Sequence, residues 1–268
     1  MTDLFTPETL PVLAARIERA QAAQNAACAR VASHGVVPLS IAGGQVIFAG
    51  AGSPLTQAVA LALGQKMTTA EFDQVEALLG REPGPMQIET CPYTDATLLA
   101  LLAERGYRIS EFQQVLVRAI ETSEAPPSGV DIRPIRAGEE ERWAQVIFEA
   151  FTDGAPLDPA LVSLMLPATR AEGTTCFMAL VDGVPAGGGA VAVHDGIATL
   201  AGAGIKVPFR RRGLQTALVR ARLAFAAQAG CAMASSSTHP GTTSQRNLER
   251  MGFRIAYPKV VLVRSKEG

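Results

Sequence analysis

Three consecutive arginines and a glycine, at positions 210–213, are the residues of this chain whose types and spacing best fit a chemical role. They follow a predicted strand and precede a helix predicted to begin at Leu214. The first backbone N–H groups of a helix have no partner inside it, and the helix dipole adds partial positive charge there. Gly213 lets the backbone approach an anion closely. The segment 210–216 therefore predicts a pyrophosphate site, with a solvated basic turn as the plain alternative.

Other glycine-rich segments do not fit a nucleotide site. The chain has no GxxxxGK[ST] pattern, which argues against a P-loop. Gly187, Gly188 and Gly189 fall inside a predicted strand, where close packing or a bulge is their expected role. The segment 50–54 follows a strand and contains a proline, which is typical of a structural loop.

The elements that must position the basic segment can be traced through the second half of the chain. Asp182-Gly183 and Asp195-Gly196 are turn pairs that predict an antiparallel meander of three strands. Strands are expected at 131–135, 174–181, 184–193, 197–207, 231–235 and 259–264, and helices at 139–151, 214–229 and 243–251. This order predicts an α+β (mixed α/β) fold with a central, mostly antiparallel mixed sheet flanked by helices.

The first half has the same kind of organisation. Helices are expected at 7–34, 70–79 and 95–105, and strands at 46–49, 86–90 and 111–119. Gly-Tyr-Arg-Ile at 106–109 and Gly-Phe-Arg-Ile at 252–255 are each followed, at equal spacing, by Val-Leu-Val-Arg. This match predicts a duplicated fold, with convergence on a common helix–glycine–strand pattern as the alternative. The proline-containing stretch 123–129 is the expected linker between domains at 1–122 and 130–268.

Composition narrows the classes of partner. The 24 basic and 25 acidic residues nearly balance, so no global field favours nucleic acid or an anionic membrane. No apolar run is long enough to span a bilayer, and the first residues do not resemble a secretion signal. Four scattered cysteines (Cys28, Cys91, Cys176, Cys231) have no metal-ligand spacing and predict buried thiols in a reducing compartment. We expect a cytoplasmic protein without a metal.

Residues 130–268 resemble a GCN5-related N-acetyltransferase (GNAT) domain. The resemblance rests on Arg210-x-x-Gly213-x-Gln215, on Phe209 before it, and on the segment 244–253 with its Gly-Phe ending. The first half is similar to a degenerate copy, because the stretch 64–70 that corresponds to the basic segment has one lysine and no arginine. The chain thus resembles a tandem GNAT protein with one working copy.

The resemblance implies acetyl-CoA as co-substrate. Strand residues near Ala203 and Ile205 would pair with its pantetheine, and the backbone of the basic segment would hold its pyrophosphate. Asn247 would be a polar contact, or else an ordinary exposed helix residue. The residues expected at the cofactor are Ala203, Ile205, Arg210, Arg211, Arg212, Gly213, Leu214, Gln215, Thr216 and Asn247. Gln215 stands where the family usually has a small residue, and it requires either a wider phosphate turn or a side chain that points outward.

Acid and base residues are less evident. Leu248 stands where many members of the family have a tyrosine acid, and the strand 197–207 has no glutamate. Tyr257 is the candidate catalytic residue, as an acid for the leaving thiolate, with packing as its alternative. His239 lies in a turn and is expected to be exposed, as are His194 and His34, whereas Trp143 is expected in the core.

These observations favour an acyl-CoA-dependent N-acyltransferase, most simply an N-acetyltransferase, acting on an amine of a small molecule or peptide. A non-catalytic acyl-CoA-binding or sensing module is the alternative from another class. A scaffold that has lost cofactor binding is a third, which the intact Arg/Gly segment argues against. The sequence is compatible with a monomer or a homodimer.

Overall fold

The chain forms two compact units, which this computed structural model describes over residues 6, 9–32, 37–50, 53–81, 84–121, 124 and 129–265. The first unit comprises residues 1–116, 237–242 and 255–268, and the second comprises 117–236 and 243–254. The expected domain boundaries are therefore wrong for the end of the chain, because its last strand pairs inside the first unit. Of the expected linker, 123–129, only Glu124 and Gly129 lie among the described residues.

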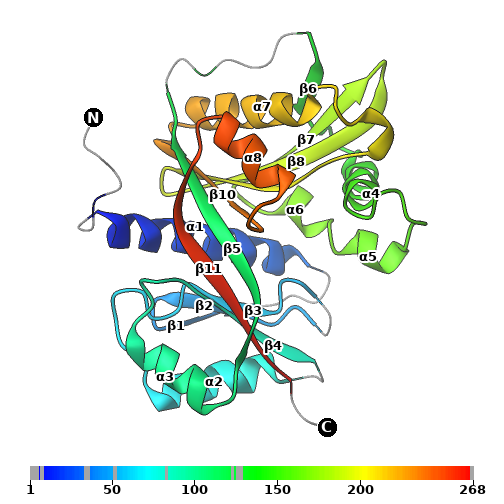
Figure 1. Cartoon of the computed structure of the whole chain (residues 1–268). Helices are drawn as coiled ribbons and strands as arrows, with labels where there is room; N and C mark the ends of the chain where they lie inside the picture. The colour runs from blue at the N-terminus through cyan, green and yellow to red at the C-terminus, as the bar shows by residue number, and fades with distance from the viewer. Residues whose placement is uncertain are drawn as a thin grey trace. The chain divides into compact units, whose positions relative to one another are not determined.

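The first unit is a sheet with helices on both faces (Figure 1). Its helices are α1 (Leu10–Val31), α2 (Thr69–Leu79) and α3 (Ala96–Glu104), and its strands are β1 (Leu39–Ile41), β2 (Gly44–Ile47), β3 (Gln57–Val59), β4 (Pro85–Thr90), and most of β5 (Arg108–Ala119) and β11 (Arg254–Ser265). The strand order is β1-β2-β3-β4-β11-β5, and β11 is antiparallel to β4, with Leu262 opposite Ile88. Helix α1 covers one face of β1–β4, and α2 and α3 cover the other.

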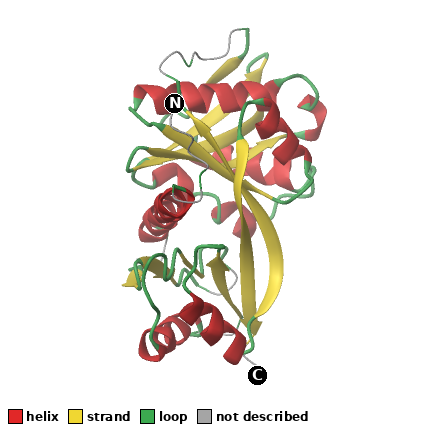
Figure 2. Ribbon diagram, turned by 60° about the vertical axis from the view of Figure 1, so that its left-hand side comes forward, coloured by secondary structure: helices red, strands yellow, loops and turns green. Residues whose placement is uncertain are grey.

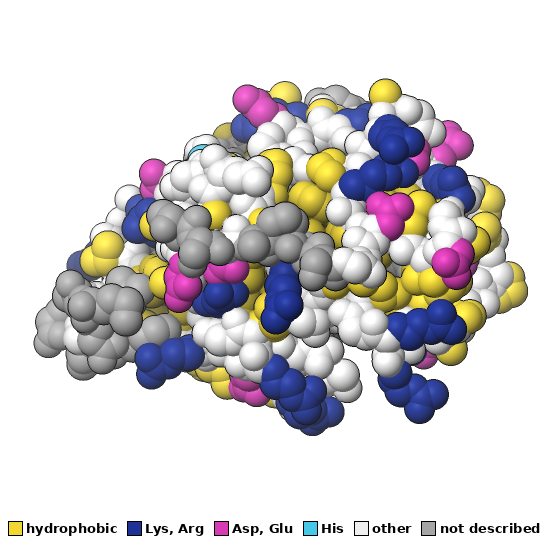
Figure 3. Space-filling model, turned by 90° about the horizontal axis from the view of Figure 1, so that it is seen from above, with side chains coloured by type: hydrophobic (Ala, Val, Ile, Leu, Met, Phe, Trp, Pro, Cys, Tyr) yellow, Lys and Arg dark blue, Asp and Glu magenta, His cyan; other side chains and the backbone are white. Residues whose placement is uncertain are grey.

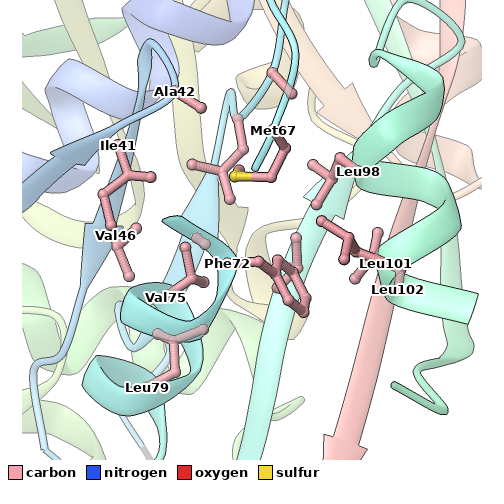
Figure 4. Packing of buried hydrophobic residues seen from close by; sticks show 14 of the residues in the cluster. Ile41, Ala42, Val46, Met67, Phe72, Val75, Leu79, Leu98, Leu101 and Leu102 are labelled. Carbon is pink, nitrogen blue, oxygen red and sulfur yellow. The ribbon is translucent and has the colours of Figure 1, made fainter. Parts of the chain in front are cut away.

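Apolar side chains from α2, α3 and the short strands form the core of the first unit (Figure 4). Phe72 is fully buried at its centre and meets Tyr107 edge-on, with ring centroids 5.9 Å apart. Helix α2 begins with a capping box, in which Thr68 accepts from the Glu71 N–H and Glu71 accepts from the Thr68 N–H. Because the capping box is a local sequence signal, the start of α2 could be predicted from the sequence to within one residue.

The second unit holds the meander (Figure 2). Its helices are α4 (Glu140–Phe151), α5 (Pro159–Ser163), α6 (Pro167–Arg170), α7 (Leu214–Gln228) and α8 (Thr243–Arg250), and its strands are β6 (Asp131–Pro134), β7 (Thr174–Val181), β8 (Val184–His194), β9 (Ile197–Ile205) and β10 (Met233–Thr238). The strand order is β10-β9-β8-β7-β6, antiparallel except for the β9–β10 pair. The expected α+β class and element order are confirmed.

Helices α4 and α7 cover opposite faces of the meander. Two neighbouring glycines of β8 show how closely each helix approaches the strand. A Cβ on Gly188 would lie 2.8 Å from Trp143 Nε1 of α4, and a Cβ on Gly189 would lie 3.2 Å from the Arg222 guanidinium of α7. Successive strand residues point to opposite faces, so each glycine admits a different helix. Trp143 is buried, as expected, and its Nε1 donates to the Phe177 carbonyl (2.9 Å).

Other expectations concern turns, thiols and charge. Both residues of the Asp182-Gly183 turn have positive φ, 51° and 77°, as a two-residue hairpin of this kind requires. All four cysteines are free and buried, as predicted.

On the face drawn in Figure 3, basic side chains form separate groups interspersed with acidic and apolar ones. No helix in the described part of the chain is both long enough and apolar enough for a membrane span.

Candidate functional site

The start of α7 presents a row of unpaired backbone donors. Among the described residues, the N–H groups of positions 211–216 have no hydrogen-bond acceptor, whereas Ala217 donates to the Gly213 carbonyl (3.0 Å). No side chain caps the helix. Unpaired N–H groups at a helix start, together with the helix dipole, favour a negatively charged ligand. The predicted anion site therefore has the donors that it needs.

Two residues of the turn adopt left-handed backbone conformations that aim these donors. Gly213 has φ 75°, and a Cβ built on it would meet no atom within 4 Å. Arg211 has φ 63°, which is unfavourable for a residue with a side chain. The turn is thus held by its surroundings, and Gly213 keeps open space in front of the helix.

Arg210 supplies part of that support. Its guanidinium donates to the Ile205 carbonyl (3.0 Å) and the Ala150 carbonyl (3.1 Å), and it pairs with Asp153. These bonds tie the turn to the end of β9 and to the last residues of α4. The side chain therefore anchors the segment, and its charge is already matched by a carboxylate.

Strand β9 offers an open edge beside the turn. Its parallel pairing with β10 ends at Thr199 and Ser235, although β9 continues to Ile205. Beyond that point, among the residues that the structure describes, β10 bonds to β9 only through the Ser236 hydroxyl, which donates to the Leu200 carbonyl (3.0 Å). The edge beyond Leu200 therefore has no strand partner on this side among the described strands, and an extended ligand can pair with it.

The turn, the open edge and the start of α8 line one cavity of about 510 Å³. This volume lies in the range of small-molecule sites. The lining residues are Ala150, Phe151, Ala203, Gly204, Ile205, Phe209, Arg210, Arg211, Gly213, Leu214, Gln215, Thr216, Thr243, Ser244 and Asn247. The cavity therefore contains every residue expected at the cofactor except Arg212, whose guanidinium lies 5.7 Å from the centroid of the Phe209 ring.

Sequence reasoning missed part of the lining. Phe151 and Gly204 come from α4 and β9, and Thr243 and Ser244 come from the start of α8. No sequence pattern predicted that Gly204 of β9 lies against α4, because this contact depends on the close approach of the Ala150 side chain. Thr243 and Ser244, by contrast, precede the expected contact Asn247 by one helical turn and share its face.

Tyr257 is not brought to this cavity, which corrects its expected role as a catalytic acid. The side chain is buried in the first unit, and its hydroxyl donates to Glu18 (2.9 Å). Burial, and then the Glu18 carboxylate, raise the pKa of this phenol well above its usual value. A phenol committed in this way packs and does not deliver a proton to a ligand. His239 is 64% exposed and His194 is also exposed, as expected, while His34 lies outside the described residues.

The sequence of the second unit matches a known family. Residues 140–253 fit the model of the Acetyltransferase (GNAT) family. These residues form a GNAT acetyltransferase domain. No curated protein sequence matches the chain.

Solved structures extend this fold beyond the GNAT domain. The chain is similar to a GCN5-related N-acetyltransferase from Kribbella flavida, with 20% identity over 96% of both chains and a TM-score of 0.65. A tandem GNAT protein from the clavulanic acid biosynthesis pathway shares 14% identity over 84% of this chain and 79% of its own, with a TM-score of 0.59. The GNAT fold thus accounts for both halves of the chain, as the duplication predicted.

The family's acetyl donor is acetyl-CoA, and the site fits it in two respects. Unpaired amides at 211–216 suit a pyrophosphate, and the open edge of β9 suits the amides of a pantetheine arm. Among the lining residues, Arg210 and Arg211 are the ones with charged side chains. No group of three or more His, Cys, Asp or Glu residues in the described ranges could hold a metal ion.

Proposed function

We propose that the chain is an acyl-CoA-dependent N-acyltransferase, most simply an N-acetyltransferase, whose acceptor is an amine of a small molecule or peptide. The observation that carries the proposal is the single cavity that joins the unpaired amides of α7 to the unpaired edge of β9. A pyrophosphate and an extended amide chain are the two recognition elements of coenzyme A, and both have matching donors in one cavity.

The residues of the cavity act by binding and positioning. The amides at 211–216 hold the pyrophosphate, and the backbone from Ala203 to Ile205 orients the pantetheine. Asn247, with Thr243 and Ser244, offers polar contacts from α8. The thioester supplies an activated acyl group, and correct orientation toward an amine can contribute much of the rate acceleration. This mechanism assigns no acid to Tyr257.

Binding of coenzyme A is the first test. At a ligand concentration about 100-fold above Kd, the midpoint of thermal unfolding of the intact protein should rise by about 5 °C. Adenosine is the control ligand, because it lacks both the pyrophosphate and the pantetheine. An unchanged midpoint with coenzyme A would contradict the proposal.

Turnover is the second test. A panel of amines, including amino acids, polyamines and peptides, is incubated with acetyl-CoA, and the released thiol is followed with a thiol reagent. The described cysteines are buried, so the protein adds little background. Release that depends on one class of amine supports the enzyme, whereas binding without release across the panel indicates a binding module.

A further inference from the structure

Arg222 is a buried cation in the core of the second unit. It lies on α7, is 2% exposed, and forms no ion pair with a carboxylate among the described residues. Burial lowers the pKa of its guanidinium to about 10, so it is still charged near neutral pH. A buried charge without a counter-ion is costly, and it persists only where hydrogen bonds compensate it.

Carbonyl oxygens provide that compensation. The Nε of Arg222 donates to the Leu218 carbonyl one turn earlier in α7 (3.1 Å). The same guanidinium donates through one nitrogen to the Ala190 carbonyl of β8 (3.1 Å) and, at a longer distance, to the Ala201 carbonyl of β9 (3.5 Å). Arg222 therefore bridges two neighbouring strands from beneath the sheet.

The bridged position is where the pairing of β8 and β9 is irregular. Gly188 pairs with Gly204, and the next pair is Ala190 with Ala201. Between these pairs lie Gly189 on β8 and two residues, Gly202 and Ala203, on β9. This is a β-bulge, and Gly202 has φ 54°, as such a bend requires. The bulge includes Ala203, which is the first residue of β9 that lines the cavity.

Gly189 leaves the room that this arrangement needs. A Cβ at this position would lie 2.9 Å from the Ala203 Cβ and 3.2 Å from the Arg222 guanidinium. A larger residue would push apart the bulge and the cation. The third glycine of the 187–189 run is thereby linked to the cavity through Arg222.

We propose that Arg222 is a positioning residue, which fixes the bulge at Gly202 and Ala203 so that the edge of β9 can receive the pantetheine arm. The inference rests on the proposed function. It assigns Arg222 to one part of the ligand only. The pyrophosphate is held by amides at the start of α7, which the Arg222 guanidinium does not contact.

Two ligands separate this role from a general role in folding. Coenzyme A carries pyrophosphate and pantetheine, whereas 3′-phospho-ADP carries the same pyrophosphate without the pantetheine. In Arg222→Met, calorimetric titration should give about tenfold weaker binding of coenzyme A, because the bridging hydrogen bonds are lost. Binding of 3′-phospho-ADP should equal that of the wild type. Arg220→Met, an exposed arginine of the same helix, is the matched control and should bind both ligands normally.

Gly189→Ala tests the bulge from the other strand and serves if Arg222→Met does not fold. It should show the same selective loss of coenzyme A binding. Equal weakening of both ligands, or normal binding of coenzyme A by a folded variant, would overturn the role of Arg222. If the wild type binds neither ligand, the proposed function fails and the inference falls with it.

Discussion

At the scale of single residues, the backbone of the basic turn offers a ligand more unengaged groups than its side chains do, among the described residues. Arg210 is engaged by two carbonyls and Asp153, and Arg212 lies over the Phe209 ring. The amides of 211–216 are the groups that remain unpaired. Their direction depends on the left-handed conformation of Gly213.

Gly213→Val should therefore weaken binding of coenzyme A more than Arg211→Ala does. A β-branched residue at φ 75° is strained by roughly 1–2 kcal/mol, so the turn will shift and misdirect the amides. We expect a loss of about tenfold or more for Gly213→Val and about threefold for Arg211→Ala, by calorimetric titration. The reverse ranking would show that side-chain charge holds the ligand.

A second prediction at the scale of single residues concerns Glu139, which forms hydrogen bonds at the start of α4. It accepts two bonds from Arg133 (2.7 and 2.8 Å) and one from the Arg136 N–H (2.8 Å). The Arg133 bonds, and then the backbone bond, lower the pKa of the carboxyl to about 2. A depressed pKa stabilises the fold above the unfolded-state value near 4.3, and the effect is lost as the pH falls toward 2.

Glu139→Gln should thus lower the free energy of unfolding by about 1 kcal/mol near pH 7, a value discounted for partial exposure. The difference from the wild type should shrink steadily between about pH 5 and pH 2. Urea unfolding at several pH values measures it, with the exposed Glu141→Gln as the control. A constant difference across this range would exclude the ion pair as its cause.

At the scale of elements, turn chemistry made the meander predictable from sequence. Asp182-Gly183 and Asp195-Gly196 fix hairpins whose positive φ values suit those residues. Strands β1 and β3 were not predicted, since each has three residues and no recognisable alternation. The bulge of β9 and the end of its pairing with β10 arise where strands distant in the sequence meet. Such long-range contacts leave no local pattern, so only part of the cavity could be anticipated.

Gly188 shows how tightly β8 and α4 are fitted. A Cβ there would lie 2.8 Å from both the Phe177 carbonyl and Trp143 Nε1, which form a hydrogen bond with each other. Gly188→Ala should therefore destabilise the protein by about 1–3 kcal/mol through overpacking. Denaturant unfolding checks this value. Val184→Ala, at an exposed position of the same strand, should change stability far less.

At the scale of the whole molecule, the ends of the two halves are similar in sequence, but the chain does not divide at a single boundary. The last strand, β11, pairs with β4 and belongs to the first unit. Sequence reasoning assigned it to the second domain, because a repeat shows which segments are alike and not which sheet each one joins. Its attachment rests on a buried polar cluster as well as on strand pairing.

Lys259 is the centre of that cluster. It is fully buried on β11 and contacts Glu18 of α1 (2.8 Å), Glu89 of β4 (2.9 Å) and the Gln21 side-chain oxygen (2.7 Å). Burial alone would lower the pKa of Lys259, but the two carboxylates raise it above its usual value. The ammonium therefore stays charged and neutralises carboxylates that lie far from it in the sequence.

Lys259→Met should leave Glu18 and Glu89 buried together without a cation, which typically costs about 3–5 kcal/mol. Because both carboxylates belong to the first unit, amide hydrogen exchange should accelerate in α1 and β4, more than 160 residues earlier in the chain than the substitution. Lys66→Met, at an exposed lysine of the same unit, is the control. Acceleration confined to residues 140–253 would instead mean that β11 stabilises the GNAT domain, as a division at the linker requires.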